Sequence, residues 1–451
     1  MTYLALESGS TLIDLTSDGM YLVDYVPRYS FGEKISTETI DVRFGGASVS
    51  AIASKIRAIE MSLLLAKAYQ DNRQGQPCYL IYQPANGLPT VRSRVVGGQI
   101  ILGDRATHYK ISNLNMDAGI IIERENYWEA TAETEIPLTN GNGTNVTGGI
   151  NVLNCNDGSG TPPNKRNNYV QIASTAISGN LPAPAKIVVQ NNYDSPTRLG
   201  EIYVSLNVYS NPAAFTHIIE GESAQYGGSN VSSSSYSGGY YRNITWTGDA
   251  QAYIANWQIP SGTIANGGGR WFKIFAALVS TPQPGTYVQS KLTFPTGAPL
   301  TIIQEDQEIL LPSSDQFVEI GTFQIPPWLI DQTLLYPLDL ILYGRRVGGG
   351  ALAIDFLYIM PADSFNLWKP RGYGLAYTTY LTVDYIEKQS YVEGYSPGGK
   401  SSIYMLFGNP IELIPGMTQR LYFSQRGVTG DININRKILV RLFYRARYGT
   451  F

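Results

Sequence analysis

The residues that could carry out chemistry are few, and their spacing does not suit it. The chain has two histidines, His108 and His217, and two cysteines, Cys78 and Cys155. No G-x-S-x-G turn is present, so a hydrolase built on a catalytic triad is not expected. The four soft ligands lack C-x-x-C or H-x-x-x-H spacing, which disfavours a zinc site. We interpret His217 as a structural histidine and both thiols as free.

Acidic residues form two groups that deserve a test. One group alternates along a predicted strand and its continuation, and so shares one face: Glu123, Glu125, Glu129, Glu133 and Glu135. Glycosidases need two carboxylates about 5 to 9 Å apart, but such ladders are more typical of solvated faces or subunit contacts. The second group is Glu305, Asp306 and Glu308, whose oxygens could hold calcium although EF-hand spacing is absent. No Walker or dinucleotide motif occurs, so we expect no cofactor.

Aromatic residues give the strongest binding signal. A Gly/Ser-rich stretch after residue 225 contains Tyr236, Tyr240, Tyr241, Trp246 and Trp257. Flat rings with a polar edge suit sugars and protein partners alike, which makes these residues candidate glycan- or partner-binding groups. The alternative is that the tryptophans form a core and the tyrosines pack loops. The sequence leaves both interpretations open.

Composition predicts a mainly β protein. The chain has 451 residues, 12% aromatic and 15% charged, with 46 glycines and 25 prolines, which favours two or three β-rich domains. The net charge of -3 is spread evenly, so nucleic-acid binding is not expected and DNA would be only passing cargo. No apolar run is long enough to cross a membrane, and residues 1–15 do not read as a signal peptide. We therefore expect a soluble, unprocessed protein.

One helix stands out from the predicted strands. Apolar residues recur at three- and four-residue steps over residues 49–68, at Val49, Ile52, Ile56, Ile59, Leu63 and Ala66. Ser48 or Ser50 can cap its start. The pattern predicts an amphipathic helix packed on an antiparallel sheet.

The order of the strands suggests four segments. Residues 1–135 form a β domain that contains the helix, and residues 136–167 read as a Gly/Asn-rich linker or ordered arm. Residues 168–361 carry seven or more alternating strands, which predicts a jelly-roll-like β-sandwich. Residues 362–451 form a C-terminal β segment that could complete the first domain.

The first domain resembles a known family. Residues 38–44 (ETIDVRF) and the aromatic, acidic strand 120–129 (IIIERENYWE) resemble phage tail proteins of the distal-tail and tail-tube superfamily. Residues 411–423 (IELIPGMTQRLYF) look like a strand ending found in such proteins, and residues 168–361 look like their galectin-like or carbohydrate-module sandwiches. The chain differs from the usual plan in its length and in its C-terminal segment.

The resemblance implies a ring former, usually a hexamer, in which sheets of neighbouring copies close around a channel. The partners would be copies of the same chain and other tail proteins, in the tail of a virion assembled in the host cytoplasm. Exposed sheet edges agree, because cyclic assembly pairs or covers them. Candidate interface residues are Glu123, Glu125, Arg441, Arg445 and Arg447, with the arginines contacting acidic strands of a neighbour.

Three functions follow from these features. The first is a non-enzymatic structural subunit of the tail tube or distal tail, with an outward sandwich. The second is a carbohydrate- or receptor-binding tail adhesin. The third is a polysaccharide-degrading enzyme that uses Glu123 and Glu305 as acid and base, against which the missing signal peptide argues.

Overall fold

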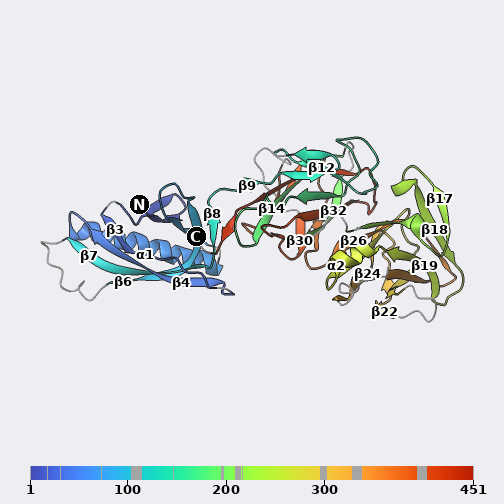
Figure 1. The fold of residues 1–451 in the computed structure, drawn as a ribbon, viewed down its shortest axis with the longest axis horizontal. Helices are drawn as coiled ribbons and strands as arrows, with labels where there is room; N and C mark the ends of the chain where they lie inside the picture. The colour runs from blue at the N-terminus through green and yellow to red at the C-terminus, as the bar shows by residue number, and fades with distance from the viewer. Residues whose placement is uncertain are drawn as a thin grey trace. The chain divides into compact units, whose positions relative to one another are not determined.

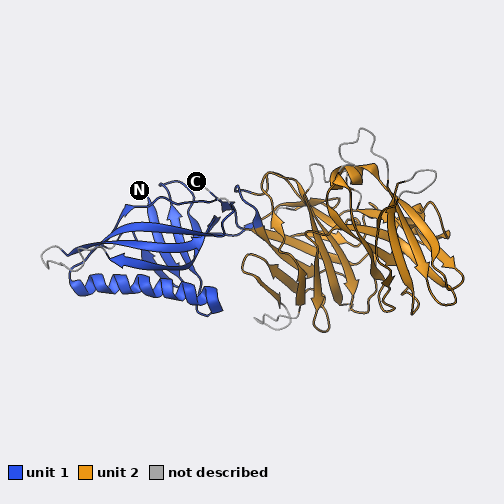
Figure 2. Cartoon of the chain, turned by 90° about the horizontal axis from the view of Figure 1, so that it is seen from below, with its two compact units in different colours: residues 1–134, 178–183, 445–451 blue, residues 135–177, 184–444 orange. Residues whose placement is uncertain are grey.

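The computed structural model describes the chain in stretches: residues 2–17, 19–30, 32–72, 74–102, 114–145, 147–193, 198–208, 215, 217–294, 302–327, 338–393 and 404–449. His108 lies outside them. The fold is mainly β with two α-helices in the described part, which confirms the predicted class. The chain forms two compact units (Figure 2). Unit 1 is residues 1–134, 178–183 and 445–451, and unit 2 is residues 135–177 and 184–444. Both chain ends belong to unit 1 (Figure 1).

Unit 1 is an antiparallel sheet with one helix. Its strands are β1 (Tyr3–Ser8), β2 (Thr11–Asp14), β3 (Met20–Asp24), β4 (Ile35–Gly45), β5 (Cys78–Gln83), β6 (Val91–Leu102), β7 (Asn115–Glu125), β8 (Trp128–Ala130) and β34 (Arg447–Tyr448). The main order is β2-β1-β5-β6-β7-β4-β3, while β8 pairs with β6 and with β34. The sheet therefore has strands β2 and β3 at its two ends.

The predicted helix is present as α1 (Val49–Asn72), four residues longer than expected. Ser48 caps it, because its Oγ accepts the N–H of Ala51 at 3.2 Å. The helix lies along one face of the sheet (Figure 2). Ile59 and Leu63 enter the core shared with the strands, whereas Ile56 is only partly buried and Val49 is exposed.

A buried ion pair joins two central strands of unit 1. Arg124 on β7 contacts both carboxylate oxygens of Glu38 on β4, at 3.0 and 2.5 Å. Both side chains are buried, and Tyr25 also donates its hydroxyl to Glu38. Because every polar group of this pair is satisfied, burial is tolerated and the strands stay in register.

Unit 2 contains two pairs of sheets. In the first pair, one sheet has the order β11 (Gly143–Asn145), β10 (Leu138–Asn140), β13 (Tyr169–Ile172), β32 (Gln419–Gly427), β15 (Leu199–Val208), β27 (Asn366–Pro370) and β30 (Tyr404–Gly408). Its partner has the order β12 (Ile150–Leu153), β33 (Lys437–Tyr444), β14 (Ala183–Asn191), β28 (Tyr380–Asp384) and β29 (Gln389–Glu393), with β31 (Glu412–Leu413) on β14. Strand β9 (Thr134–Glu135) precedes these elements. We name this pair the first sandwich.

The second pair is inserted between β15 and β27. One sheet has the order β17 (Ser229–Ser232), β18 (Tyr240–Trp246), β26 (Gly350–Pro361), β20 (Trp271–Leu278) and β24 (Phe317–Gln324), with β16 (Ile218–Glu220) on β26. The other has the order β19 (Ala252–Ile259), β25 (Leu338–Arg345), β21 (Tyr287–Thr293) and β22 (Ile302–Glu305), with β23 (Ile309–Leu310) on β21. Helix α2 (Ser261–Gly267) and two short 3-10 turns, η3 (Gly221–Ser223) and η4 (Ser237–Gly239), complete it. Both sheets contribute to one apolar core, and we name this pair the second sandwich.

The domain boundaries therefore differ from those predicted. Residues 136–167 are neither linker nor free arm, because they supply β10, β11 and β12. The block 168–361 is divided between the two sandwiches, and of the C-terminal segment 362–451 only residues 445–451 join unit 1. The predicted β-sandwich is present, while a jelly-roll strand order stays a prediction.

Asparagine side chains explain why the segment 136–167 is ordered despite its composition. Asn154 is buried; its amide donates to the carbonyls of Gln425 and Asn433 at 2.6 and 2.9 Å, and its Oδ1 accepts the N–H of Gln425. Asn140 donates to the carbonyls of Asn151 and Tyr169. These bonds replace the apolar burial that the segment lacks.

Candidate functional site: an open sheet face

The alternation of side chains along β4 and β7 leaves one face of the unit 1 sheet open. Ile40, Val42 and Phe44 point into the core, and the residues between them, such as Thr39 and Asp41, are exposed. Strand β7 alternates in the same way. The strict period of two therefore builds a covered face and an exposed face on the same strands.

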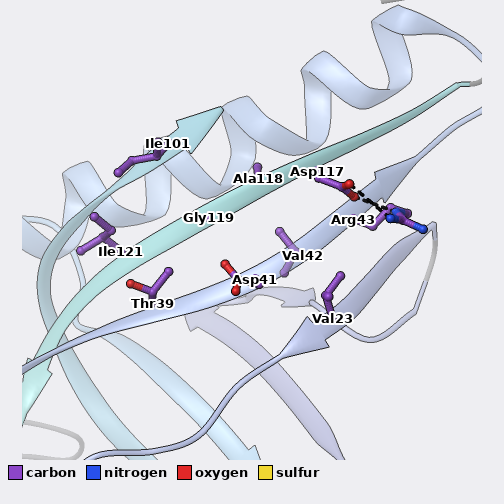
Figure 3. Close-up of a pocket in the computed structure, with 10 residues that line it drawn as sticks. All are labelled: Val23, Thr39, Asp41, Val42, Arg43, Ile101, Asp117, Ala118, Gly119 and Ile121. Carbon is purple, nitrogen blue, oxygen red and sulfur yellow. Dashed lines mark hydrogen bonds and ion pairs between the residues drawn. The ribbon is translucent and has the colours of Figure 1, made fainter. Parts of the chain in front are cut away.

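A shallow groove of about 430 Å³ crosses this exposed face. Figure 3 shows its lining residues on neighbouring strands, with α1 on the far side of the sheet. Arg43 and Asp117 form a two-point ion pair across β4 and β7, at 2.7 and 3.2 Å. The rest of the lining is largely aliphatic, including Val23, Ile101 and Ile121.

The edge strand β3 continues this surface. Its residues Tyr21 and Val23 are exposed, and Val26 follows just beyond its end. In the described part of unit 1, β3 pairs with β4 alone, so its other side has no strand beside it. An edge with exposed apolar side chains is a docking surface for another chain, because both hydrogen-bonding groups and apolar area are left open. No group here is arranged as a nucleophile or an acid–base pair.

The predicted interface arginines contact acidic strands, but those of their own chain. Arg445 bonds Glu129 at 3.5 Å and Glu133 at 3.2 Å within unit 1. Arg447 donates to the Tyr127 hydroxyl at 2.8 Å and lies over its ring. The reason is strand pairing, which sets Arg447 opposite Glu129.

The remaining predicted interface residues also have local partners, with one exception. Arg441 holds Glu135 through two bonds of 2.8 Å within unit 2. Glu125 pairs with Arg94 and accepts the Tyr127 hydroxyl. Glu123 stays exposed on β7. These ion pairs hold the C-terminal strands in place, and only Glu123 keeps a carboxylate directed to solvent.

The predicted binding aromatics separate into two groups. Trp246 and Trp257 lie in the core of the second sandwich, where the Trp257 indole donates to the Gly221 carbonyl at 3.1 Å. That burial removes both from any ligand surface. Tyr236 and Tyr241 meet edge to face at 5.2 Å between ring centres, while Tyr240 is exposed.

The acidic loop considered for calcium is occupied by protein partners. Glu305 pairs with Lys291 at 3.0 Å, and Arg345 grips Glu308 at 2.7 and 2.6 Å. Asp306 accepts the N–H of Thr322. Among the described residues no cluster of three or more His, Cys, Asp or Glu has the geometry of a metal site.

A buried carboxyl cluster in the second sandwich was not predicted. Asp355 accepts the Ser237 N–H at 2.8 Å, and the Ser237 hydroxyl bonds Glu220 at 2.9 Å. Burial raises the pKa of Asp355 to about 8 and that of Glu220 to about 7, and each carboxyl reinforces the other. Asp355 is 3% exposed, so the cluster is structural rather than a substrate site. Its members are far apart in sequence, and no local pattern indicates them.

The possible nucleophile partners are also structural. His217 is buried, its Nε2 lies 2.7 Å from the Asn168 Oδ1, and burial lowers its pKa to about 3. Cys78 and Cys155 are free and buried, as predicted, and burial raises the pKa of both thiols. No helix of the described part combines the length and apolar character needed to cross a bilayer.

Comparison with known proteins identifies no family. No family model matches the chain, and no curated protein matches it. Two structural neighbours are chains of the phage p2 baseplate in its activated conformation, one with Sr and one with Ca. They share 10% and 8% identity and a TM-score of 0.26, with 77% of this chain and 99% of theirs covered. A third belongs to the Glycosylation Associate Protein (Gap123) complex from Streptococcus agalactiae, at 12% identity and a TM-score of 0.18; the match spans 43% of this chain and 30% of that one. At these scores the neighbours do not establish the function, which must be inferred from the chain's own surfaces.

Proposed function

We propose that this chain is a structural, non-enzymatic subunit of a phage tail, in the tube or the distal tail. Unit 1 assembles with copies of itself into a ring, a hexamer by the family resemblance, around a channel that DNA only passes through. The other partners are further tail proteins of the virion. Support comes from the likeness of residues 38–44 and 120–129 to tail proteins and from the one-helix β architecture of unit 1.

The observation that carries the proposal is the exposed edge of unit 1. Strand β3 presents Tyr21 and Val23 beside the open groove of β4 and β7. A monomer with such an edge is prone to unregulated association, whereas a closed ring satisfies every copy in the same way. The edge is therefore best explained as an assembly surface.

The absence of a catalytic arrangement in the described part supports the structural role. Glu123 and Glu305, the predicted acid and base, belong to different compact units. Glu305 is also paired with Lys291, which keeps it ionised and unsuited to donate a proton.

Sedimentation velocity and negative-stain microscopy of the full chain test the proposal. We expect rings of the wild type, and a shift to monomers for Val23→Asp, because a charge at the interface would be buried without a partner. Val347→Asp is the matched control: Val347 is 78% exposed in a turn of unit 2, against 61% for Val23, and should leave the rings intact. Monomers at every protein and salt concentration, or rings unaffected by Val23→Asp, would refute it.

A further inference from the structure

The outer face of the sheet β19-β25-β21-β22 in the second sandwich carries a row of tyrosines. Along β25, Leu340 and Leu342 point into the core, and Tyr343 points outward. Tyr253 lies directly opposite Tyr343 on β19. Tyr226, which bridges to Asn256, adds a third ring from a preceding loop. Side-chain alternation thus places three aromatic rings on one solvent-facing surface.

Two of these rings form an ordered platform. Tyr226 and Tyr253 stack with ring centres 4.4 Å apart and planes within 2°, and Tyr343 lies 5.7 Å from Tyr253. Tyr226 is 52% exposed although Tyr253 covers one of its faces, so its opposite face is open to solvent. We name Tyr226, Tyr253 and Tyr343 the tyrosine platform. A flat, open ring held by a second ring is suited to stack on a planar or saturated ring of a ligand.

A row of polar side chains borders the tyrosine platform. The Gln251 amide donates to Gln289 Oε1 at 2.7 Å, and Gln289 in turn donates to Glu305 at 2.8 Å. Lys291 pairs with Glu305 and lies 4.6 Å from the centre of the Tyr343 ring. Amide, carboxylate and ammonium groups therefore lie side by side, fixed by one another, at the margin of the aromatic surface.

The charges on this face cancel in pairs. Lys291 is neutralised by Glu305, and Arg345 by Glu308. An anionic ligand would gain little here, because each cation already has a carboxylate partner. A protein interface would bury paired charges and amides at a cost, and such groups are depleted from interface cores. A ligand with many neutral hydroxyl groups fits both the polar row and the open ring.

We propose that the tyrosine platform and its bordering row, Gln251, Gln289, Lys291 and Glu305, form a binding site for a neutral saccharide. A pyranose ring stacks on the open face of Tyr226, and its hydroxyls exchange hydrogen bonds with the Gln289 amide and the Glu305 carboxylate. The site differs from the aromatic set predicted from sequence, in which Trp246 and Trp257 are buried. It lies wholly in unit 2 and does not depend on ring assembly.

Calorimetric titration of the full chain with neutral hexasaccharides of glucose, galactose, mannose, rhamnose and N-acetylglucosamine tests the proposal, with a hexagalacturonate as the anionic probe. We expect binding of at least one neutral probe, with a dissociation constant of about 1 mM or tighter. Tyr226→Ala should weaken it about tenfold, because the stacking ring is lost. Gln289→Ala should weaken it as well, through the lost hydrogen bonds.

Tyr240→Ala is the matched control, because Tyr240 is similarly exposed, at 45%, but lies on β18 outside the platform. It should bind as the wild type does. The proposal is overturned if no neutral hexasaccharide binds, if only the galacturonate binds, or if Tyr226→Ala and Gln289→Ala both retain full affinity. Sedimentation of the same variants reports ring assembly separately, so the two proposals can fail independently.

Discussion

At the scale of single residues, the carboxyl of Asp355 links stability to pH. It lies against the Ser237 N–H, with Glu220, Glu222 and Asp157 near enough to raise its pKa further. Burial is the largest cause, and it raises the pKa of Asp355 from 3.8 to about 8. Because the folded state binds this proton more tightly than the unfolded state, folding is favoured where the group is protonated.

The second sandwich should therefore lose stability as pH rises. The contribution is complete below about pH 4 and disappears as pH passes through about 8, the folded pKa of Asp355. Glu220, with its pKa raised to about 7, acts in the same direction. Calorimetric scans across this window should show the melting temperature of the second sandwich falling.

Asp355→Asn should flatten that pH dependence, because an amide keeps the acceptor for Ser237 but does not titrate. Asp363→Asn, at an exposed position, should leave the slope unchanged. A steep slope that persists in Asp355→Asn would assign the effect to other groups.

The arginines near the C-terminus show how far residue-level prediction reaches. Their sequence context indicated acidic partners, and Arg445 does bond Glu129 and Glu133. What the sequence did not reveal was that the partners belong to the same chain, because the pairing of β34 with β8 joins residues more than 300 positions apart. The tyrosine platform was missed for a similar reason: Tyr343 is distant in sequence from Tyr226 and Tyr253.

At the scale of elements, helix α1 separates two adjacent leucines. Leu63 is 3% exposed and packs in the core of unit 1, whereas Leu64 is 59% exposed. Leu63→Ala should destabilise unit 1 by about 2 to 5 kcal/mol, because it leaves a cavity. Leu64→Ala should change its stability by less than about 0.5 kcal/mol. Urea unfolding followed by circular dichroism would compare the two, and equal effects would contradict this packing.

Periodicity predicted α1 well because the helix and its partner sheet lie close in sequence. It overstated Ile56, which faces the margin of the core, and it ended the helix too early, at residue 68 rather than Asn72. The segment 136–167 failed differently. Its order depends on side-chain amides such as Asn154 bonding to backbone from residues beyond 420, which composition cannot show.

At the scale of the whole molecule, the insertion of one sandwich into another explains the misplaced boundaries. Strands β15 and β27 pair directly, with Tyr203 opposite Leu367, although the whole second sandwich lies between them in sequence. A reading in chain order joins neighbours in sequence and so merged parts of both sandwiches. Nothing local marks the point at which the first sandwich is interrupted.

The same pairing predicts a tolerated deletion. If residues 209–361 are replaced by Asn-Gly, Val208 and Ala362 are joined by a two-residue turn that keeps the register of β15 and β27. Unit 1 and the first sandwich should still unfold cooperatively by calorimetry. Their stability should be reduced, because Tyr203 and Tyr422 pack in the core shared with the insert and become uncovered.

A deletion that removes one further residue is the control. It shifts the register by one position and turns the apolar face of β27 outward, so the first sandwich should not fold. Equal behaviour of the two deletions would contradict the pairing.

The junction at β15 and β27 also has a consequence for descent. A module whose two ends meet at neighbouring strands can be lost, acquired or traded by a lineage in one event, while the region proposed to build the ring is left untouched. Related chains are then expected to vary most between positions 208 and 362, in both size and specificity, and to keep Tyr203 and Tyr422 only where a module still covers them.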